Sequence, residues 1–149
     1  MIKTICYLGP DCSGKDSTMH KVAKLLDYTV FSMPRSPICN IVYDALYDRI
    51  DDKRHDANMD LIKLMIKTMN TYFVLVFAEA QTLYQRGIAR NEKHMDSATK
   101  YELHIRFYKS YFRIIKAQFL DYQNRFIMID NTNLSIEKTA EEVWKQIQI

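Results

Sequence analysis

A glycine-containing loop close to the N-terminus constrains this chain more than any other feature. Two of the three glycines, Gly9 and Gly14, bracket the run Gly9-Pro10-Asp11-Cys12-Ser13-Gly14-Lys15, which has the form G-x-x-x-x-G-K and follows the apolar run Ile5-Cys6-Tyr7-Leu8. A strand that leads into such a loop and then into a helix binds phosphate groups. The glycines let successive backbone N–H groups point toward one anion, and the lysine adds a positive charge. The alternative is a tight turn that binds no ligand.

The residue after the lysine departs from the usual form of this loop. Asp16 stands where the pattern has Ser or Thr to hold Mg²⁺. A carboxylate is a hard oxygen ligand, so we expect Asp16 to bind Mg²⁺ directly or through a water molecule. Ser17 is the second candidate, since one residue along a helix turns the side chain by about 100°. The predicted phosphate-binding residues are therefore Gly9, Pro10, Asp11, Cys12, Ser13, Gly14, Lys15, Asp16 and Ser17.

Length and composition limit the classes of protein to consider. The 149 residues fit one domain, residues 1–149, with a sizeable core. A net charge of only +3 argues against an extended nucleic-acid surface but permits a local basic pocket. The three cysteines are odd in number and lack metal-ligand spacing, which favours a reduced intracellular environment. No apolar run is long enough to cross a bilayer and no signal-peptide pattern is present, so we expect a cytoplasmic protein.

Hydrophobic periodicity predicts that strands and helices alternate along the chain. We expect strands over residues 3–8, 28–33, 72–78 and 125–130. A helix is expected to begin at Lys15, and a second to run from Pro37 as far as Arg49 after an N-cap at Ser36. Further helices are expected over residues 59–69, 80–90 and 98–122, and from Ser135 through residue 147. The charged stretch 51–56 is expected to be a solvated loop. Apolar residues within 98–122 alternate spacings of four and three, which indicates packing on the sheet or another helix, with a coiled-coil homodimer as the alternative.

This alternation predicts four parallel strands in a three-layer α/β/α sandwich, the fold class of the P-loop NTPases. The nearly continuous apolar run 72–78 is typical of a strand buried on both faces of such a sheet. Ligands bind at the carboxyl ends of the strands in these folds. That edge is predicted to hold residues 9–16, Arg35, Glu79 and residues 130–133.

These segments resemble a known family. The loop with Asp after its lysine is similar to that of some phage deoxynucleoside monophosphate kinases, and the whole layout resembles the thymidylate-kinase-like branch of P-loop nucleoside and nucleotide kinases. Residues 33–43 resemble the family's Asp-Arg-x-x-x-Ser-x-x-x-Tyr stretch after an inner strand. Residues 71–77 and 83–90 resemble its strand and arginine-bearing lid, and 126–130 its closing strand. Pro34 replaces the carboxylate that orients the acceptor, Cys39 replaces Ser, and the chain is shorter than most members.

The resemblance implies ATP and Mg²⁺ as cofactors and assigns roles to four basic residues. Lys15 would bridge the β- and γ-phosphates, Arg35 would contact phosphates or the acceptor, and Arg86 and Arg90 would act as arginine fingers. The alternatives are a salt bridge for Arg35 near a strand end, and a solvated basic face for Arg86 and Arg90. Glu79 would hold a metal-bound water or interact with a helix dipole. Asn131 and Asn133 would line an adenine pocket or turn the chain. Asp44 and Asp48 are candidates to replace the missing acceptor carboxylate, but we interpret them as surface charges with basic residues nearby.

The leading hypothesis is an ATP-dependent kinase of a nucleoside monophosphate, in particular a deoxynucleotide. One alternative is a nucleoside kinase or polynucleotide 5′-kinase on the same core, although a polynucleotide substrate calls for a basic groove that the charge balance does not favour. A different class is a non-catalytic nucleotide-binding or sensor protein, which Pro34 and Asp16 suggest.

Overall fold

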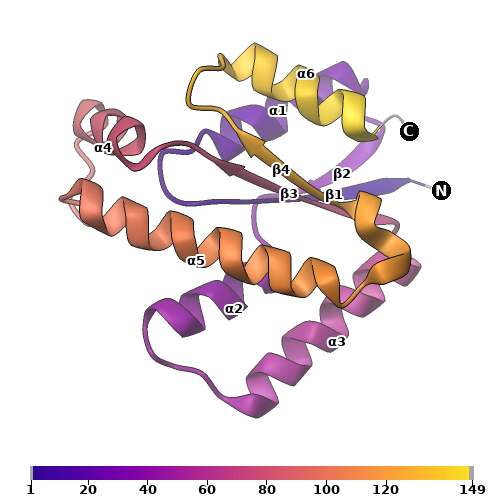
Figure 1. The fold of residues 1–149 in the computed structure, drawn as a ribbon. Coiled ribbons are helices and arrows are strands. Elements are labelled where there is room, and N and C mark those ends of the chain that lie inside the picture. The colour runs from indigo at the N-terminus through magenta and orange to yellow at the C-terminus, as the bar shows by residue number, and fades with distance from the viewer. Residues whose placement is uncertain (1, 148–149) are drawn as a thin grey trace.

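The computed structural model describes residues 2–147 as a four-stranded parallel sheet with helices on both faces (Figure 1). The elements in chain order are β1 (Lys3–Leu8), α1 (Lys15–Leu25), β2 (Val30–Met33), α2 (Pro37–Leu46), α3 (Asp52–Thr68), β3 (Thr71–Phe77), α4 (Ala80–Ala89), α5 (Ala98–Ala117), a 3₁₀ segment (Leu120–Arg125), β4 (Phe126–Asp130) and α6 (Ile136–Ile147). The strand order is β2-β1-β3-β4, and each neighbouring pair is parallel. The predicted three-layer α/β/α class is confirmed.

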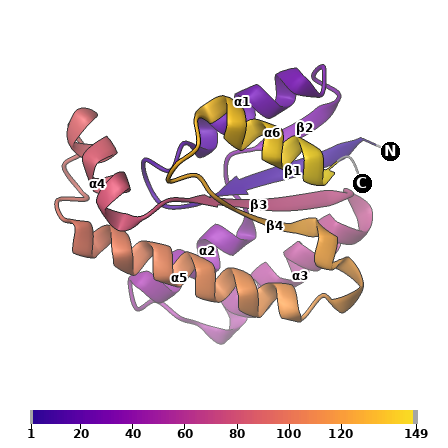
Figure 2. The ribbon, with the colours of Figure 1, turned by 45° about the horizontal axis from the view of Figure 1, so that its top comes forward.

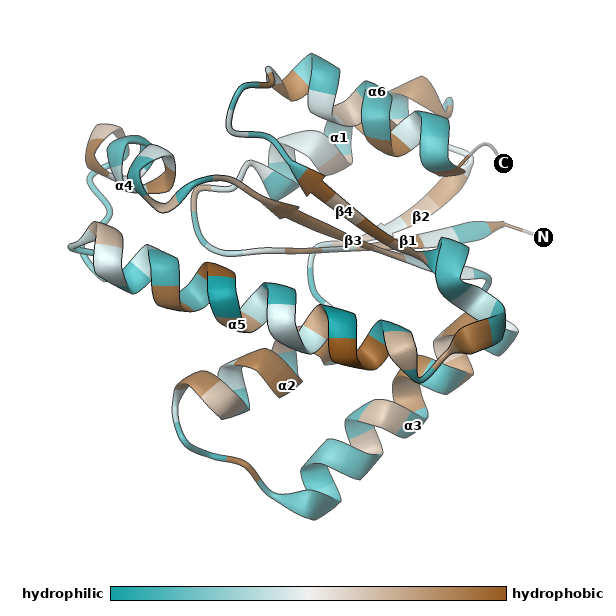
Figure 3. Cartoon of the chain, viewed as in Figure 1, coloured by the Kyte–Doolittle hydropathy of each residue, from teal (hydrophilic) through white to brown (hydrophobic). Residues whose placement is uncertain are grey.

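The central strand β3 explains the layering. All of its residues are buried, and their side chains alternate between two hydrophobic clusters. Phe73, Leu75 and Phe77 pack against the helices α2, α3 and α5, whereas Tyr72, Val74 and Val76 pack toward α1 and α6. Figure 2 shows these two helix groups on opposite faces, and Figure 3 shows hydrophobic strands between helices whose outer surfaces are largely polar. A strand covered on both faces needs the uninterrupted apolar run found in the sequence.

The expected start of α3 and the expected end of α5 are wrong. The charged stretch 51–56 is not a loop, because α3 already begins at Asp52. The Asp51 carboxylate caps this helix by accepting a hydrogen bond from the Lys53 backbone N–H at 2.9 Å, and acidic residues at a helix start interact favourably with the helix dipole. Helix α5 ends at Ala117 instead of reaching residue 122, and the Gln123 amide donates to the carbonyls of Lys116 and Phe119 where the chain turns.

The second strand is shorter than expected and lies at the edge of the sheet. Asp27 and Tyr28 have φ values of 51° and 57°, so the chain cannot become extended before Val30. Helix α2 likewise ends at Leu46, which leaves Arg49 in the connection to α3. The resemblance places the stretch around Arg35 after an inner strand, but β2 pairs only with β1. Within residues 2–147, no helix combines the length and apolar character needed to cross a lipid bilayer.

Candidate phosphate-binding site

The glycine-containing loop connects β1 to α1 at the carboxyl edge of the sheet. Gly9 has a φ of 151°, and a Cβ atom there would overlap the backbone carbonyl oxygen of Val76 in β3. Only glycine therefore lets the loop pass so close to the central strand. Gly14 has a φ of 82° and precedes α1 without a side-chain cap. The first N–H groups of α1 have no intrahelical partners, as in any helix, and here they also lack a side-chain cap, which is the arrangement that binds anions.

A pocket of about 320 Å³ lies against this loop. It is lined by Pro10, Asp11, Cys12, Ser13, Gly14, Lys15, Asp16, Ser17, Arg90 and Glu92. The structure thus brings the loop residues from 10 to 17 together with one of the two lid arginines, and Gly9 stands just before them. The Lys15 ammonium donates a 2.8 Å hydrogen bond to the carbonyl oxygen of Gly9 and thereby links the two ends of the loop.

The charges in this pocket are consistent with a role for a divalent cation. Two cations, Lys15 and Arg90, face three carboxylates, those of Asp11, Asp16 and Glu92. A triphosphate would meet net negative charge there unless a metal ion accompanied it. Asp16 is exposed at the loop and supplies the hard oxygen that Mg²⁺ prefers. No group of three or more metal-ligating side chains exists in residues 2–147, so phosphate oxygens and water would complete the coordination.

The outer side of the loop is held by a clamp of two residues, Asn131 and Arg86. The buried Asn131 follows β4, and its side-chain Nδ2 donates to the Ser13 carbonyl at 2.7 Å. Arg86 on α4 donates through Nη1 to the Cys12 carbonyl at 3.3 Å and to Asn131 Oδ1 at 3.2 Å. Its Nη2 donates to the Asn131 carbonyl at 3.4 Å. These bonds connect two loop carbonyls to α4 and to the end of β4, through residues that do not line the phosphate pocket.

Arg86 and Arg90 therefore have different positions although they are four residues apart. Arg90, which follows the last residue of α4, is exposed and lines the phosphate pocket, whereas Arg86 contacts the loop from outside it. Arg35 is exposed after β2 and lines a separate pocket. Glu79 is the N-cap residue of α4, outside the phosphate pocket, and its backbone N–H donates to Thr132 Oγ1 at 2.9 Å.

Asp44 and Asp48 were both expected at the surface, and for Asp44 this is wrong. The Asp44 side chain is only 8% exposed and forms an ion pair with Arg54 at 2.7 Å. Burial of a carboxylate requires such a partner, because desolvation of an unpaired charge costs several kcal/mol, of the order of 5. Asp48 is exposed as expected.

An aromatic group that the sequence analysis did not identify as a unit lies beside the loop. The ring of Tyr43 on α2 meets His104 and Tyr108 of α5 edge-on, with centroids 6.5 and 6.2 Å apart. Burial lowers the pKa of His104, and the negative charge of Asp11 opposes that effect. Tyr101 donates a hydrogen bond to the sulfur of Cys12 at 3.5 Å. Tyr101, His104 and Tyr108 recur at i, i+3 and i+7, and this spacing is the signal that identifies the shared helix face.

Comparison with known proteins extends the fold assignment. No family model matches the sequence, and no curated protein matches it either. Among solved structures, the chain is similar to deoxyadenosine kinase from M. mycoides with bound dCTP. The alignment covers 97% of this chain and 98% of that one, with a TM-score of 0.59 and 12% sequence identity. This likeness shows a shared fold, and the resemblance to P-loop nucleotide kinases, the phage monophosphate kinases among them, stays a prediction.

Proposed function

We propose that this protein transfers a phosphoryl group from ATP to a deoxynucleoside monophosphate. The observation that carries the proposal is the loop between β1 and α1, whose Gly14, uncapped helix N-terminus and Lys15 line a pocket of about 320 Å³. Phosphoryl transfer requires little covalent chemistry from a protein. It requires that the reacting groups are aligned and that the charge on the transferred group is neutralised.

Each residue of the pocket has a role in this proposal. Backbone N–H groups from Asp11 to Asp16 bind the phosphates of ATP, and Lys15 leaves the Gly9 carbonyl to contact the β- and γ-phosphates. Mg²⁺, bound at Asp16 with phosphate oxygens, would offset the carboxylate charge of the pocket. Arg90 contacts the transferred phosphoryl group, and Arg86 keeps the loop in its binding conformation through the clamp with Asn131.

The identity of the acceptor rests on two different observations. The similar solved structure is a deoxyadenosine kinase, which favours an acceptor of the nucleoside class and makes a nucleoside kinase the second candidate. Arg35 lines a pocket with two further arginines, which favours an acceptor that already carries a phosphate. The three cysteines, Cys6, Cys12 and Cys39, are free and buried, which supports our proposal of a cytoplasmic location.

The test is a transfer assay with labelled ATP and Mg²⁺ against deoxynucleosides, deoxynucleoside monophosphates and 5′-hydroxyl oligonucleotides. We expect transfer to at least one monophosphate, with no transfer by a Lys15→Ala variant. Tight ATP binding without transfer to any acceptor would instead identify a nucleotide-binding protein, for which Pro34 at the acceptor position provides a reason. Transfer only to oligonucleotides would reject the proposal.

A further inference from the structure

A second pocket, of about 360 Å³, collects three arginines next to α2. Its lining residues are Arg35, Asn40, Tyr43, Asp44, Arg49 and Arg54. The three arginines come from three parts of the chain: Arg35 from the connection after β2, Arg49 from the connection after α2, and Arg54 from the first turn of α3. Sequence reasoning identified only Arg35, because the other two arginines are brought to it by the way α2 and α3 fold back on each other.

A buried carboxylate holds two of these arginines in place. Asp44 Oδ1 lies 2.7 Å from Arg54 Nη2 and 3.7 Å from Arg49 Nε. Asp44 is nearly inaccessible to solvent, whereas the side chains of Arg49 and Arg54 are 54% and 52% exposed. Each guanidinium has five N–H donors, so the contact with one carboxylate oxygen leaves most of them directed elsewhere. Within residues 2–147, no carboxylate lies within salt-bridge distance of Arg35.

The charge of this pocket matches a phosphate monoester. Three guanidinium groups and one carboxylate leave two positive charges, and a phosphate monoester carries about 1.5 to 2 negative charges at pH 7. Arginine also binds phosphate through two parallel hydrogen bonds, which lysine does not offer. Asn40 and Tyr43 supply neutral polar groups at the pocket wall.

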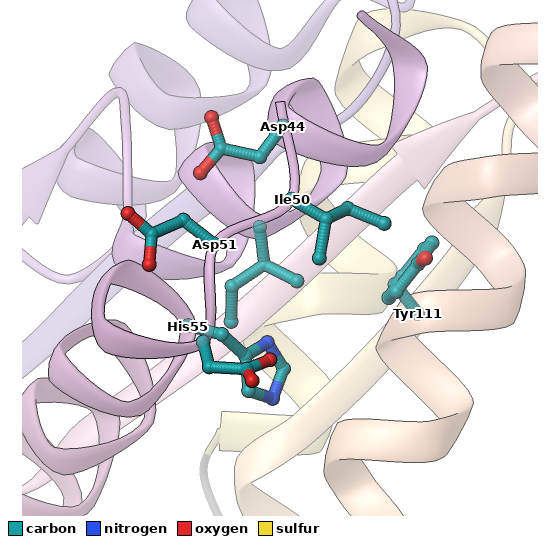
Figure 4. Close-up of a pocket in the computed structure, with 7 residues that line it drawn as sticks. Asp44, Ile50, Asp51, His55 and Tyr111 are labelled. Atoms are coloured by element: carbon teal, nitrogen blue, oxygen red, sulfur yellow. The ribbon is translucent and has the colours of Figure 1, made fainter. Parts of the chain in front are cut away.

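A neighbouring pocket of about 260 Å³ has the opposite character. It is lined by Ile41, Asp44, Ile50, Asp51, Asp52, His55 and Tyr111. Figure 4 shows the carboxylate of Asp44 on the side away from Tyr111, with the Asp51 carboxylate also at that side. Three carboxylates at this pocket disfavour a phosphate there. The arginine-lined side of Asp44 is therefore where an anion would bind.

The position of the arginine pocket connects it with the phosphate loop. Met33 pairs with Cys6 in the parallel β1–β2 register, so Arg35 leaves the sheet beside the start of the loop on the adjacent strand. Tyr43 belongs to the arginine pocket and also lies near enough to Asp11 of the loop for that charge to raise the pKa of its phenol, although burial is the larger cause. The two pockets have no residue in common.

We infer that Arg35, Arg49 and Arg54, with Asp44 positioning the last two, bind the phosphate that the acceptor already carries. This inference rests on the proposed function and names the acceptor's class: a 5′-phosphate monoester and not the corresponding nucleoside. This arginine pocket shares no residue with the phosphate pocket proposed for ATP, but it lies beside it. That arrangement lets an acceptor phosphate approach the transferred group.

Binding measurements test the pocket separately from catalysis. Calorimetric titrations would use inorganic phosphate and each deoxynucleoside monophosphate, alongside the matched deoxynucleoside, in the presence of a non-hydrolysable ATP analogue and Mg²⁺. We expect the monophosphate to bind at least about tenfold more tightly than its nucleoside. Arg49→Gln is expected to weaken monophosphate binding about tenfold or more while ATP affinity changes less than about twofold. Arg113→Gln, an exposed arginine on α5 outside both pockets, is the matched control and is expected to change neither affinity.

Two further variants address folding. Arg54→Gln alone would leave the buried Asp44 without its close partner, so the Asp44→Asn/Arg54→Gln pair removes both charges together. With a native circular dichroism spectrum, this double variant should also lose at least about tenfold in monophosphate affinity. Equal monophosphate affinity in the wild type, Arg49→Gln and the double variant would overturn the inference even if kinase activity were present. Loss of phosphate binding in both variants would uphold the pocket even if no acceptor were phosphorylated.

Discussion

Replacement of Asn131 by alanine tests whether the clamp on the outer side of the loop determines nucleotide binding. The change removes the 2.7 Å bond to the Ser13 carbonyl and the 3.2 Å bond from Arg86, and both Asn131 and Ser13 are about 1% exposed. A buried carbonyl left without a donor costs about 1–3 kcal/mol, and a hydrogen bond to a charged group contributes about 1.5–3 kcal/mol. Because Arg86 is only partly buried and keeps two other acceptors, we expect the free energy of unfolding to fall by about 2–4 kcal/mol.

The same change should weaken ATP binding. A loosened loop must be ordered again when the triphosphate binds, and each 1.4 kcal/mol spent on that ordering raises the Kd about tenfold. Urea unfolding with and without ATP and Mg²⁺, together with calorimetric titration of ATP, would measure both effects. We expect a Kd at least about tenfold higher than in the wild type.

Two variants make the Asn131 experiment specific. Asn131→Asp keeps an acceptor for Arg86 but places an oxygen against the Ser13 carbonyl, so its loss of stability should come from the loop contact alone. Asn124→Ala changes an exposed asparagine in the 3₁₀ segment, outside the phosphate pocket, and should match the wild type. Wild-type stability and ATP affinity in Asn131→Ala would refute the assignment of the clamp.

Three other perturbations have expected outcomes. Lys15→Ala should lower ATP affinity and any turnover by several orders of magnitude, measured by calorimetry and by the transfer assay; full activity would remove the phosphate-loop assignment. Gly9→Ala should lower the free energy of unfolding by about 2–5 kcal/mol in urea titrations, because a Cβ overlaps the Val76 carbonyl oxygen at a positive φ, whereas Gly14→Ala should cost only about 1–2 kcal/mol. Burial lowers the pKa of His104 below 6.5, so the unfolded chain binds more protons than the native protein just below that pH, and stability should fall as the pH drops through 6.5. A His104→Gln variant should lack this dependence in urea unfolding between pH 5.5 and 7.5, and a slope identical to that of the wild type would contradict the assignment to His104.

The sequence was sufficient for the sheet and for the position of the glycine-containing loop between β1 and α1, because both depend on local patterns. The apolar run of β3 and the spacing of Gly9, Gly14 and Lys15 have few structural interpretations. The sequence pattern does not predict the start of α3, because a run of charges is typical of a solvated loop, although Asp51 is a good N-cap residue. Boundaries set by backbone conformation, such as the delayed start of β2 after Tyr28, have no clear signal in residue type.

The rest of the candidate site depends on contacts between residues far apart in the chain. Asn131 reaches Ser13, and Asp44 meets Arg54, only after the helices have packed on the sheet. Sequence spacing placed Arg86 and Arg90 on one helix face, but it did not show that one of them contacts the back of the loop. The basic neighbours of Asp44 in the sequence predict solvated ion pairs at the surface, whereas its burial comes from the packing of α2 against α3 and α5.

The contact between Gly9 and the Val76 carbonyl has a mechanical consequence. The loop is seated on β3, the same strand that continues into the α4 helix with Arg86 and Arg90. Any displacement of β3 along its own axis would therefore move the glycine-containing loop and both guanidinium groups in the same direction. The distance between the loop and the two guanidinium groups should therefore change little when the outer helices are slightly distorted. We expect substitutions on the exposed surfaces of α3 and α6 to affect nucleotide affinity far less than a shift in the pairing of β1 with β3.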